Sequence, residues 1–224
     1  MRYKLILMDA DDTIFDFQAA NRTAVGLLME ELGLSSPTIF DEYQAINHAC
    51  WEALERGEMT QEVLHVERFR RFLSSKGRND DPKKTADRFA ELLGSQAISL
   101  PGAEETVKAL CEQRKVVIVT NGITQIQKGR MSRSPIRKWV HGVVISQEVG
   151  AAKPGKRIFE SALGDVDAKD ALMIGDSAQS DVKGANNAGI DVCWLNPKGK
   201  TLPEGVHAEY EIQDIRDCLP IALS

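Results

Sequence analysis

The strongest constraint on the fold is a run of four apolar residues, 5–8, followed at once by Asp9, Asp11 and Asp12. A short apolar segment of this kind is typical of a strand buried on both faces of a parallel sheet, which we expect over residues 4–8. Because side chains alternate along a strand, Asp9 and Asp11 are predicted to project together beyond its end, with Asp12 turned away into a turn or helix cap. Clustered carboxylates there are costly without a cation or proton, so a ligand site is favoured over a simple acidic loop.

Further apolar runs resemble this first strand and alternate with amphipathic segments. Such alternation predicts a parallel sheet covered by helices on both faces, a doubly wound, Rossmann-like α/β core. Right-handed crossovers would then place the carboxyl ends of all strands at one edge of the sheet. The later strands are expected at 116–119, 143–145, 171–174 and 190–195, and the intervening helices at 103–112, 125–133, 156–163 and 182–188.

The first crossover is anomalously long. A strand–helix–strand unit needs about 30 residues, yet roughly 100 separate the first two predicted strands. No strand-like alternation occurs between residues 18 and 95, where apolar residues recur at helical spacing. We therefore predict an inserted all-helical cap at 17–96 and a core formed by 1–16 with 97–224. Helices are expected over 18–32, over 38–56, from Thr60 onward and over 85–93.

Composition limits the partners of the chain. The 224 residues are 42% hydrophobic and carry a net charge of −5. That balance argues against a nucleic-acid polymer or an anionic membrane surface as partner and leaves a small molecule. The first apolar run is too short for a signal peptide or a membrane span. A monomer and a homodimer are both compatible with these features.

The cysteine and histidine residues give no metal-binding pattern. Four cysteines lie far apart in the sequence without a Cys-x-x-Cys pair, and the four histidines lack zinc-like spacing. Cys111 and Cys193 fall in apolar segments and are expected to be buried thiols. This usage fits a reducing cytoplasm better than a disulfide scaffold, so we expect a cytoplasmic protein.

Polar residues recur at the predicted strand ends. Oxygen ligands without histidine or cysteine suit a hard cation, and Mg²⁺ is the expected cofactor. Four carboxylates outweigh the charges of Mg²⁺ and one lysine even before a phosphate dianion binds, so one carboxyl is expected to carry a proton and could serve as a general acid. A threonine and backbone amides can donate to phosphate oxygens. The residues concerned are Asp9, Asp11, Thr120, Asn121, Lys153, Asp176 and Asp181.

These motifs, taken in order, resemble the haloacid dehalogenase superfamily. The resemblance rests on Asp-x-Asp-x-Thr after the first strand, Thr120 after the second, Lys153-Pro154 after the third and Gly-Asp-x-x-x-x-Asp at 175–181. It covers essentially the whole chain. The inserted helices are similar to the first-type helical cap of that superfamily.

The resemblance implies a role for each acidic residue. Asp9 would be the nucleophile of an aspartyl-phosphate intermediate, and Asp11 would serve as acid and then as base. Mg²⁺ would be held by Asp9, the Asp11 backbone carbonyl and Asp176, with Asp181 supporting it directly or through water. Asp181 could also cap the helix that follows it. Thr120, Asn121 and Lys153 would bind the phosphoryl group.

Within the superfamily, several stretches look most like the YjjG-type pyrimidine 5′-nucleotidases: 9–13, 43–47 with Trp51, 120–122, 144–146 through Lys153-Pro154, and 193–196. Enzymes of that type dephosphorylate nucleotides such as dUMP and dTMP. A base needs aromatic faces and amide partners, which Phe17, Tyr43, Asn47, Trp51 and Phe69 could supply, although aromatics at helical spacing are more often core. The nearest alternative is a phosphatase for sugar phosphates or other small metabolites. A phosphomutase or a dehalogenase is less favoured, and a non-catalytic phospho-receiver is the alternative from another class.

Overall fold

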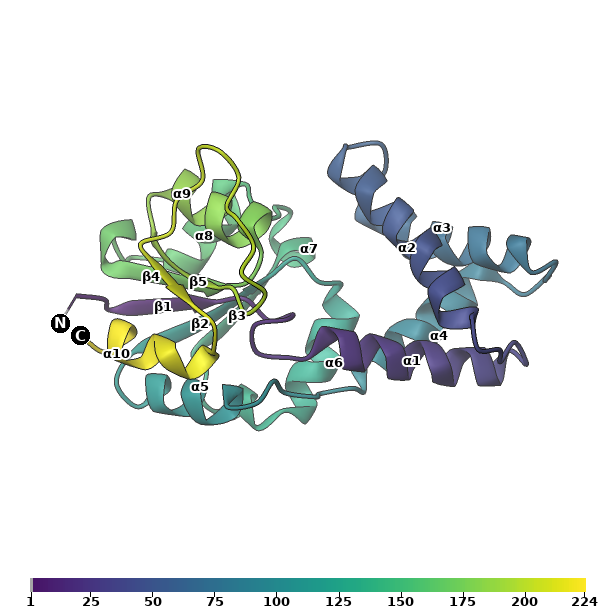
Figure 1. Ribbon diagram of the computed structural model, residues 1–224, viewed down its shortest axis with the longest axis horizontal. Coiled ribbons are helices and arrows are strands. Elements are labelled where there is room, and N and C mark those ends of the chain that lie inside the picture. Colours follow the sequence, from purple (N-terminus) through teal and green to yellow (C-terminus); the bar gives the residue numbers. More distant parts are fainter. Residues whose placement is uncertain (1) are drawn as a thin grey trace. The chain divides into compact units, whose positions relative to one another are not determined.

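The computed structural model describes residues 2–224, apart from the side chain of Glu55. The chain divides into two compact units. One unit joins the N-terminal residues up to Gln18 to Ala97–Ser224, and the other is Ala19–Gln96. Helix α1 (Phe17–Glu31) begins in the first unit and continues into the second (Figure 1).

The first unit is built on a six-stranded sheet in the order β3-β2-β1-β4-β5-β6. All neighbouring strands run parallel, and β1 lies between β2 and β4, with Leu5 opposite both Lys115 and Ala171. The predicted parallel α/β core is thereby confirmed. The strands are β1 (Leu5–Met8), β2 (Lys115–Thr120), β3 (Gly142–Ile145), β4 (Ala171–Gly175), β5 (Asp191–Leu195) and β6 (Tyr210–Ile212).

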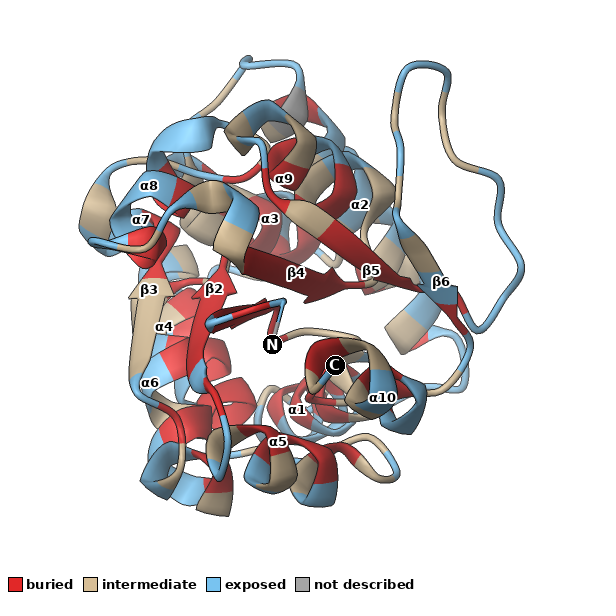
Figure 2. Ribbon diagram, turned by 90° about the vertical axis from the view of Figure 1, so that its left-hand side faces the viewer, coloured by how far each residue is buried: buried red, intermediate tan, exposed pale blue. Residues whose placement is uncertain are grey.

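Helices cover both faces of this sheet (Figure 2). Ile6 and Met8 of β1 pack with α5, α6 and α10, whereas Leu5 and Leu7 pack with α8 and α9. This division follows from the alternation of side chains along a strand and explains why β1 is apolar throughout. The helices are α5 (Ala103–Cys111), α6 (Thr124–Arg133), α7 (Ser146–Val149), α8 (Lys156–Leu163), α9 (Lys183–Ala188) and α10 (Cys218–Ala222).

The second unit is helical throughout. Its core is a group of buried aromatic rings, in which Tyr43 stacks on Phe69 at 5.4 Å between ring centroids and contacts Phe72 edge-on. Helix α4 begins earlier than predicted because Asp81 caps it, accepting hydrogen bonds from two backbone N–H groups of the first turn. After α1, the helices are α2 (Ile39–Glu55), α3 (Gln61–Ser75) and α4 (Pro82–Gly94).

Three local features differ from the sequence prediction. The short strand β6 and helix α10 were not anticipated because neither has a long apolar run. The helix expected over 182–188 is preceded by a π-helical turn over Ala178–Val182. Cys193 is buried as expected, but Cys111 is partly exposed. Within the described residues, no helix is both long and apolar enough to cross a membrane.

Candidate active site

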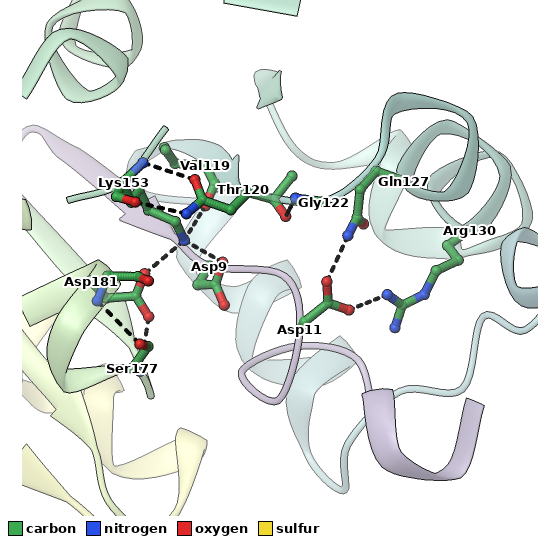
Figure 3. A network of polar contacts seen from close by, with 12 residues as sticks. Asp9, Asp11, Val119, Thr120, Gly122, Gln127, Arg130, Lys153, Ser177 and Asp181 are labelled. Carbon is green, nitrogen blue, oxygen red and sulfur yellow. Dashed lines mark hydrogen bonds and ion pairs between the residues drawn. The ribbon is translucent and has the colours of Figure 1, made fainter. Parts of the chain in front are cut away.

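The carboxyl ends of the central strands bring Asp9 close to Lys153 and Asp181 (Figure 3), and Asp176 belongs to the same acidic group. Asp9 directly follows β1, and its backbone N–H extends the ladder by donating to Ile174 O at 2.9 Å. Thr120 is the last residue of β2, and Asp176 directly follows β4. Lys153 enters from the segment between α7 and α8.

Lys153 is the centre of the buried part of the site. Its ammonium group donates to Asp9 Oδ1 at 2.5 Å, to Asp181 Oδ1 at 2.6 Å and to the backbone oxygen of Val119 at 2.8 Å. The side chain is almost fully buried. Burial alone would lower the pKa of this amine, but the carboxylates of Asp181 and Asp9 raise it above the ordinary value. Lys153 is therefore a fixed positive charge beside the expected nucleophile.

Burial works against the charge on Asp9 and Asp176. Desolvation raises the pKa of Asp9 well above its ordinary value, although the Lys153 ammonium opposes this shift. Desolvation, assisted by the carboxylates of Asp181 and Asp12, raises the pKa of Asp176 to about 7. Both carboxyls thus favour a bound proton or a nearby cation.

Asp181 is held in place by the backbone around it. Its Oδ2 accepts a hydrogen bond from the Ser177 N–H at 3.0 Å, and its side chain is completely buried. It is not the helix cap that the sequence left open, because Ser177 fills that position by accepting from Ser180 N–H. Gly175 makes the placement possible, since a Cβ there would lie 2.4 Å from Asp181 Oδ2.

Three carboxylates form a group that fits a hard divalent cation. Asp9, Asp176 and Asp181 each offer one oxygen, and these oxygens lie within 4.8 Å of one another. An all-oxygen donor set suits Mg²⁺. Asp176 also lines a cavity of about 480 Å³ that is shared with Asp12 and Lys200 and gives solvent access to this carboxyl. The Asp176 backbone oxygen accepts from the Trp194 indole at 2.9 Å, which fixes the loop.

Asp11 lies apart from this group, contrary to the prediction that it projects together with Asp9. Its side chain points toward α6, where it accepts from Gln127 Nε2 at 2.7 Å and forms an ion pair with Arg130 (Figure 3). The physical reason is a turn after Asp9, in which the N–H groups of Ile14 and Phe15 both bond to Ala10 O, so strand alternation no longer applies.

The sequence did not identify Gln127 and Arg130 as residues of the site. Helix α6 has few apolar residues, so its polar positions resemble a solvated face. Its buried residues are nevertheless Ile126, Gln127, Arg130 and Met131, a stripe at helical spacing in which polar residues occupy two buried positions. With Arg130, the site holds a second fixed cation that the charge count omitted, which reduces the need for a protonated carboxyl.

Asp12 has the structural role that was expected for it. Its Oδ1 accepts from the Phe17 N–H at 3.1 Å, and its Oδ2 accepts from the side chain of Gln18, so it caps the start of α1. Its φ of 58° lies in the left-handed region, which aspartate tolerates better than most residues. The side chain is thereby turned away from Asp9.

Thr120 and Asn121 hold the neighbouring loops. The Thr120 hydroxyl accepts from the Gly122 N–H at 3.1 Å. The side chain of Asn121 exchanges two hydrogen bonds of 2.8 Å with the backbone of Lys153. Its side-chain amide therefore positions the lysine loop, and phosphate binding by the backbone amides near Asn121 stays a prediction.

The residues predicted to contact a base differ in exposure. Tyr43 and Phe69 are completely buried in the helical unit, so the prediction of a base contact is wrong for both. The Asn47 carboxamide accepts from Arg68 Nη1 at 3.1 Å within the same unit. Phe17, Asn47 and Trp51 are partly exposed, and their contact with substrate stays a prediction.

Comparison with known proteins gives relatives that span the chain. The pyrimidine 5′-nucleotidase PynA of Streptococcus pneumoniae is 34% identical, over 98% of this chain and 96% of that protein. The pyrimidine 5′-nucleotidase YjjG of Escherichia coli is 33% identical, over 97% of this chain and 96% of that protein. The structure of the HAD-hydrolase YfnB from Bacillus subtilis, bound to magnesium, is 31% identical with a TM-score of 0.91, and the match covers 99% of both chains.

The family assignment rests on both the site and the sequence. Asp9 and Asp176 directly follow strands, Thr120 ends one, and the buried Lys153 pairs with Asp9 and Asp181. The sequence profile of the haloacid dehalogenase-like hydrolases matches residues 3–189, which is more than half of the chain. The chain therefore belongs to the haloacid dehalogenase-like hydrolases.

Proposed function

We propose that this hydrolase cleaves nucleoside 5′-monophosphates and prefers pyrimidine nucleotides such as dUMP and dTMP. The observation that carries the hydrolytic part is the buried ion pair between Lys153 and Asp9, set beside the carboxylates of Asp176 and Asp181. The names of the two full-length relatives, both pyrimidine 5′-nucleotidases, support the substrate class. A small phosphomonoester also suits a chain of net charge −5 with no basic groove expected from its sequence.

In the first half-reaction, Asp9 would attack phosphorus. A bond forms between an Asp9 carboxylate oxygen and phosphorus, and the bond from phosphorus to the nucleoside oxygen breaks. Asp11 would give a proton to the departing oxygen. Lys153 and the Thr120 hydroxyl would bind the transferring phosphoryl oxygens, and the lysine also offsets charge on the nucleophile.

In the second half-reaction, water would attack the phosphorylated Asp9. The oxygen of water bonds to phosphorus, the bond to Asp9 breaks, and Asp11 accepts the proton that water loses. Asp9, Asp176, the Asp11 backbone carbonyl and Asp181, directly or through water, would hold Mg²⁺. When bound, the ion supplies positive charge to the phosphoryl oxygens and to the clustered carboxylates.

We infer that the helical unit selects the leaving group. It interrupts the first crossover of the core and carries the partly exposed side chains of Asn47 and Trp51, while the partly exposed Phe17 precedes it by two residues. Aromatic faces and a carboxamide suit a pyrimidine ring better than a polyhydroxylated sugar.

The test is phosphate release with Mg²⁺ from a panel containing dUMP, dTMP, UMP, purine nucleotides and several sugar phosphates. We expect the highest kcat/KM for the pyrimidine nucleotides and no release by an Asp9→Asn variant. Faster release from sugar phosphates would retain the core chemistry but overturn the nucleotide preference. An absence of turnover, with Mg²⁺ bound, would favour the phospho-receiver instead.

A further inference from the structure

Arg130 is a buried charge with an unusual environment. Its side chain has no exposed surface and packs over the ring of Phe15, with its guanidinium carbon 4.6 Å from the ring centroid. Nη1 pairs with Asp11 Oδ1, but Nε and Nη2 have no hydrogen-bond partner among the described residues. A guanidinium in this setting depends on Asp11 for its compensation.

Gln127 holds the second oxygen of the same carboxylate. Its Nε2 donates to Asp11 Oδ2 at 2.7 Å, while its Oε1 is buried without a partner in the described part of the chain. A Cβ at residue 122 would lie 2.2 Å from Gln127 Nε2, so Gly122 leaves the space that this side chain needs. The two donors lie almost one turn apart on α6 and fix both oxygens of Asp11.

The arrangement is poorly explained by stability alone. Buried polar atoms without partners cost free energy, and three such atoms belong to Gln127 and Arg130. Asp11 itself keeps 28% of its side chain exposed, so the carboxylate remains open to water on one side. What the two donors provide is a fixed position for that carboxylate.

We propose that Gln127 and Arg130 are positioning residues that hold Asp11 where it accepts the proton of the hydrolytic water. This inference rests on the proposed function. In the step concerned, the oxygen of water bonds to phosphorus, the bond from phosphorus to Asp9 breaks, and Asp11 takes the released proton. Loss of either donor would slow this step and leave Asp9 phosphorylated for longer.

The test uses p-nitrophenyl phosphate, whose leaving group departs without a proton. Formation of the phosphorylated enzyme then needs no acid, but its hydrolysis still needs Asp11 as base. For Gln127→Leu and Arg130→Lys with Mg²⁺, we expect steady-state turnover to fall at least about tenfold. A rapid burst approaching one nitrophenolate per chain should precede the slow phase. The matched control is Gln125→Leu, the same change at an exposed position of α6, which should behave as the unaltered protein.

A second measurement separates positioning from general damage. In an Asp11→Asn background, Gln127→Leu should cause no further loss of turnover, because the group that it positions is already inactive. If Arg130→Lys fails to fold, the comparison of Gln127→Leu alone with Gln127→Leu in the Asp11→Asn background still tests the positioning role. Unchanged turnover, a fall without a burst, or full additivity with Asp11→Asn would overturn the inference and leave the proposed function intact. An unaltered protein that releases phosphate from neither dUMP nor p-nitrophenyl phosphate would overturn the proposed function itself.

Discussion

The environment of each acidic side chain in this site depends on the group that it contacts. Asp9, Asp11, Asp176 and Asp181 are chemically alike, yet each has a different environment. Lys153 pairs with Asp9 and Asp181, and Arg130 pairs with Asp11. A cavity opens onto Asp176. We expect these four carboxyls to respond differently to the same substitution.

Asp11→Asn should keep the fold while losing most activity. The new carboxamide oxygen can still accept from Arg130. The carboxamide of Gln127 can rotate so that its Oε1, which has no partner among the described residues, accepts from the new amide. The ionic part of the pair is lost, so the free energy of unfolding should fall by about 1–3 kcal/mol. Turnover of dUMP should fall about 100-fold or more. Thermal unfolding and steady-state kinetics measure both, and a turnover close to that of the unaltered protein would refute the role of Asp11 as acid and base.

Asp176 should make the metal-free protein less stable as pH rises. Its pKa of about 7 in the fold exceeds the ordinary 3.8, so between these values the folded state holds a proton that the unfolded chain has lost. Stability attributable to this group is therefore greatest in acid and declines through that interval, by a few kcal/mol at most.

The comparison is with Asp176→Asn in the presence of EDTA. We expect the Tm of the unaltered protein to fall relative to that of the variant between about pH 4 and pH 7. Added Mg²⁺ at the higher pH should restore the unaltered protein more than the variant. A difference in Tm that does not change with pH would contradict the assignment.

Among the secondary-structure elements, the buried strands were predicted most reliably, because each is a short apolar run in the sequence. The strands β1, β2 and β4 could be predicted because each is buried on both faces, and their carboxyl ends carried the predicted site residues. The direction of Asp11 could not be predicted, since it depends on a turn over 10–15 and on α6, more than a hundred residues away in sequence. The burial of Tyr43 could not be predicted either, because helical spacing identifies one face of a helix but not whether that face packs on another helix or contacts a ligand.

The start of α4 offers a test of how one residue fixes an element. Asp81 Oδ1 accepts from Lys83 N–H at 2.8 Å and from Lys84 N–H at 3.2 Å, and Pro82 occupies the first turn. Asp81→Ala should lower the free energy of unfolding by about 1 kcal/mol, whereas Asp81→Asn should retain most of it, since asparagine caps as well as aspartate. Denaturant unfolding measures the difference. Equal losses in both variants would show that the cap contributes nothing.

The whole molecule combines a parallel α/β unit that carries the charged site with a helical unit that interrupts its first crossover. We propose that phosphoryl transfer passes through Asp9, which directly follows the central strand β1. With a divalent cation bound, that ion, Lys153 and Arg130 would together balance the charge of the four carboxylates.

Intact-mass and peptide mass spectrometry of the protein, quenched during turnover of dUMP with Mg²⁺, would detect the phosphorylated Asp9. We predict a single phosphoryl group on the peptide that contains Asp9, absent from Asp9→Asn and absent when EDTA replaces Mg²⁺. With p-nitrophenyl phosphate as substrate, the Gln127→Leu variant should raise the phosphorylated fraction. Sustained turnover without phosphorylation, or a phosphoryl group on any other residue, would contradict the account.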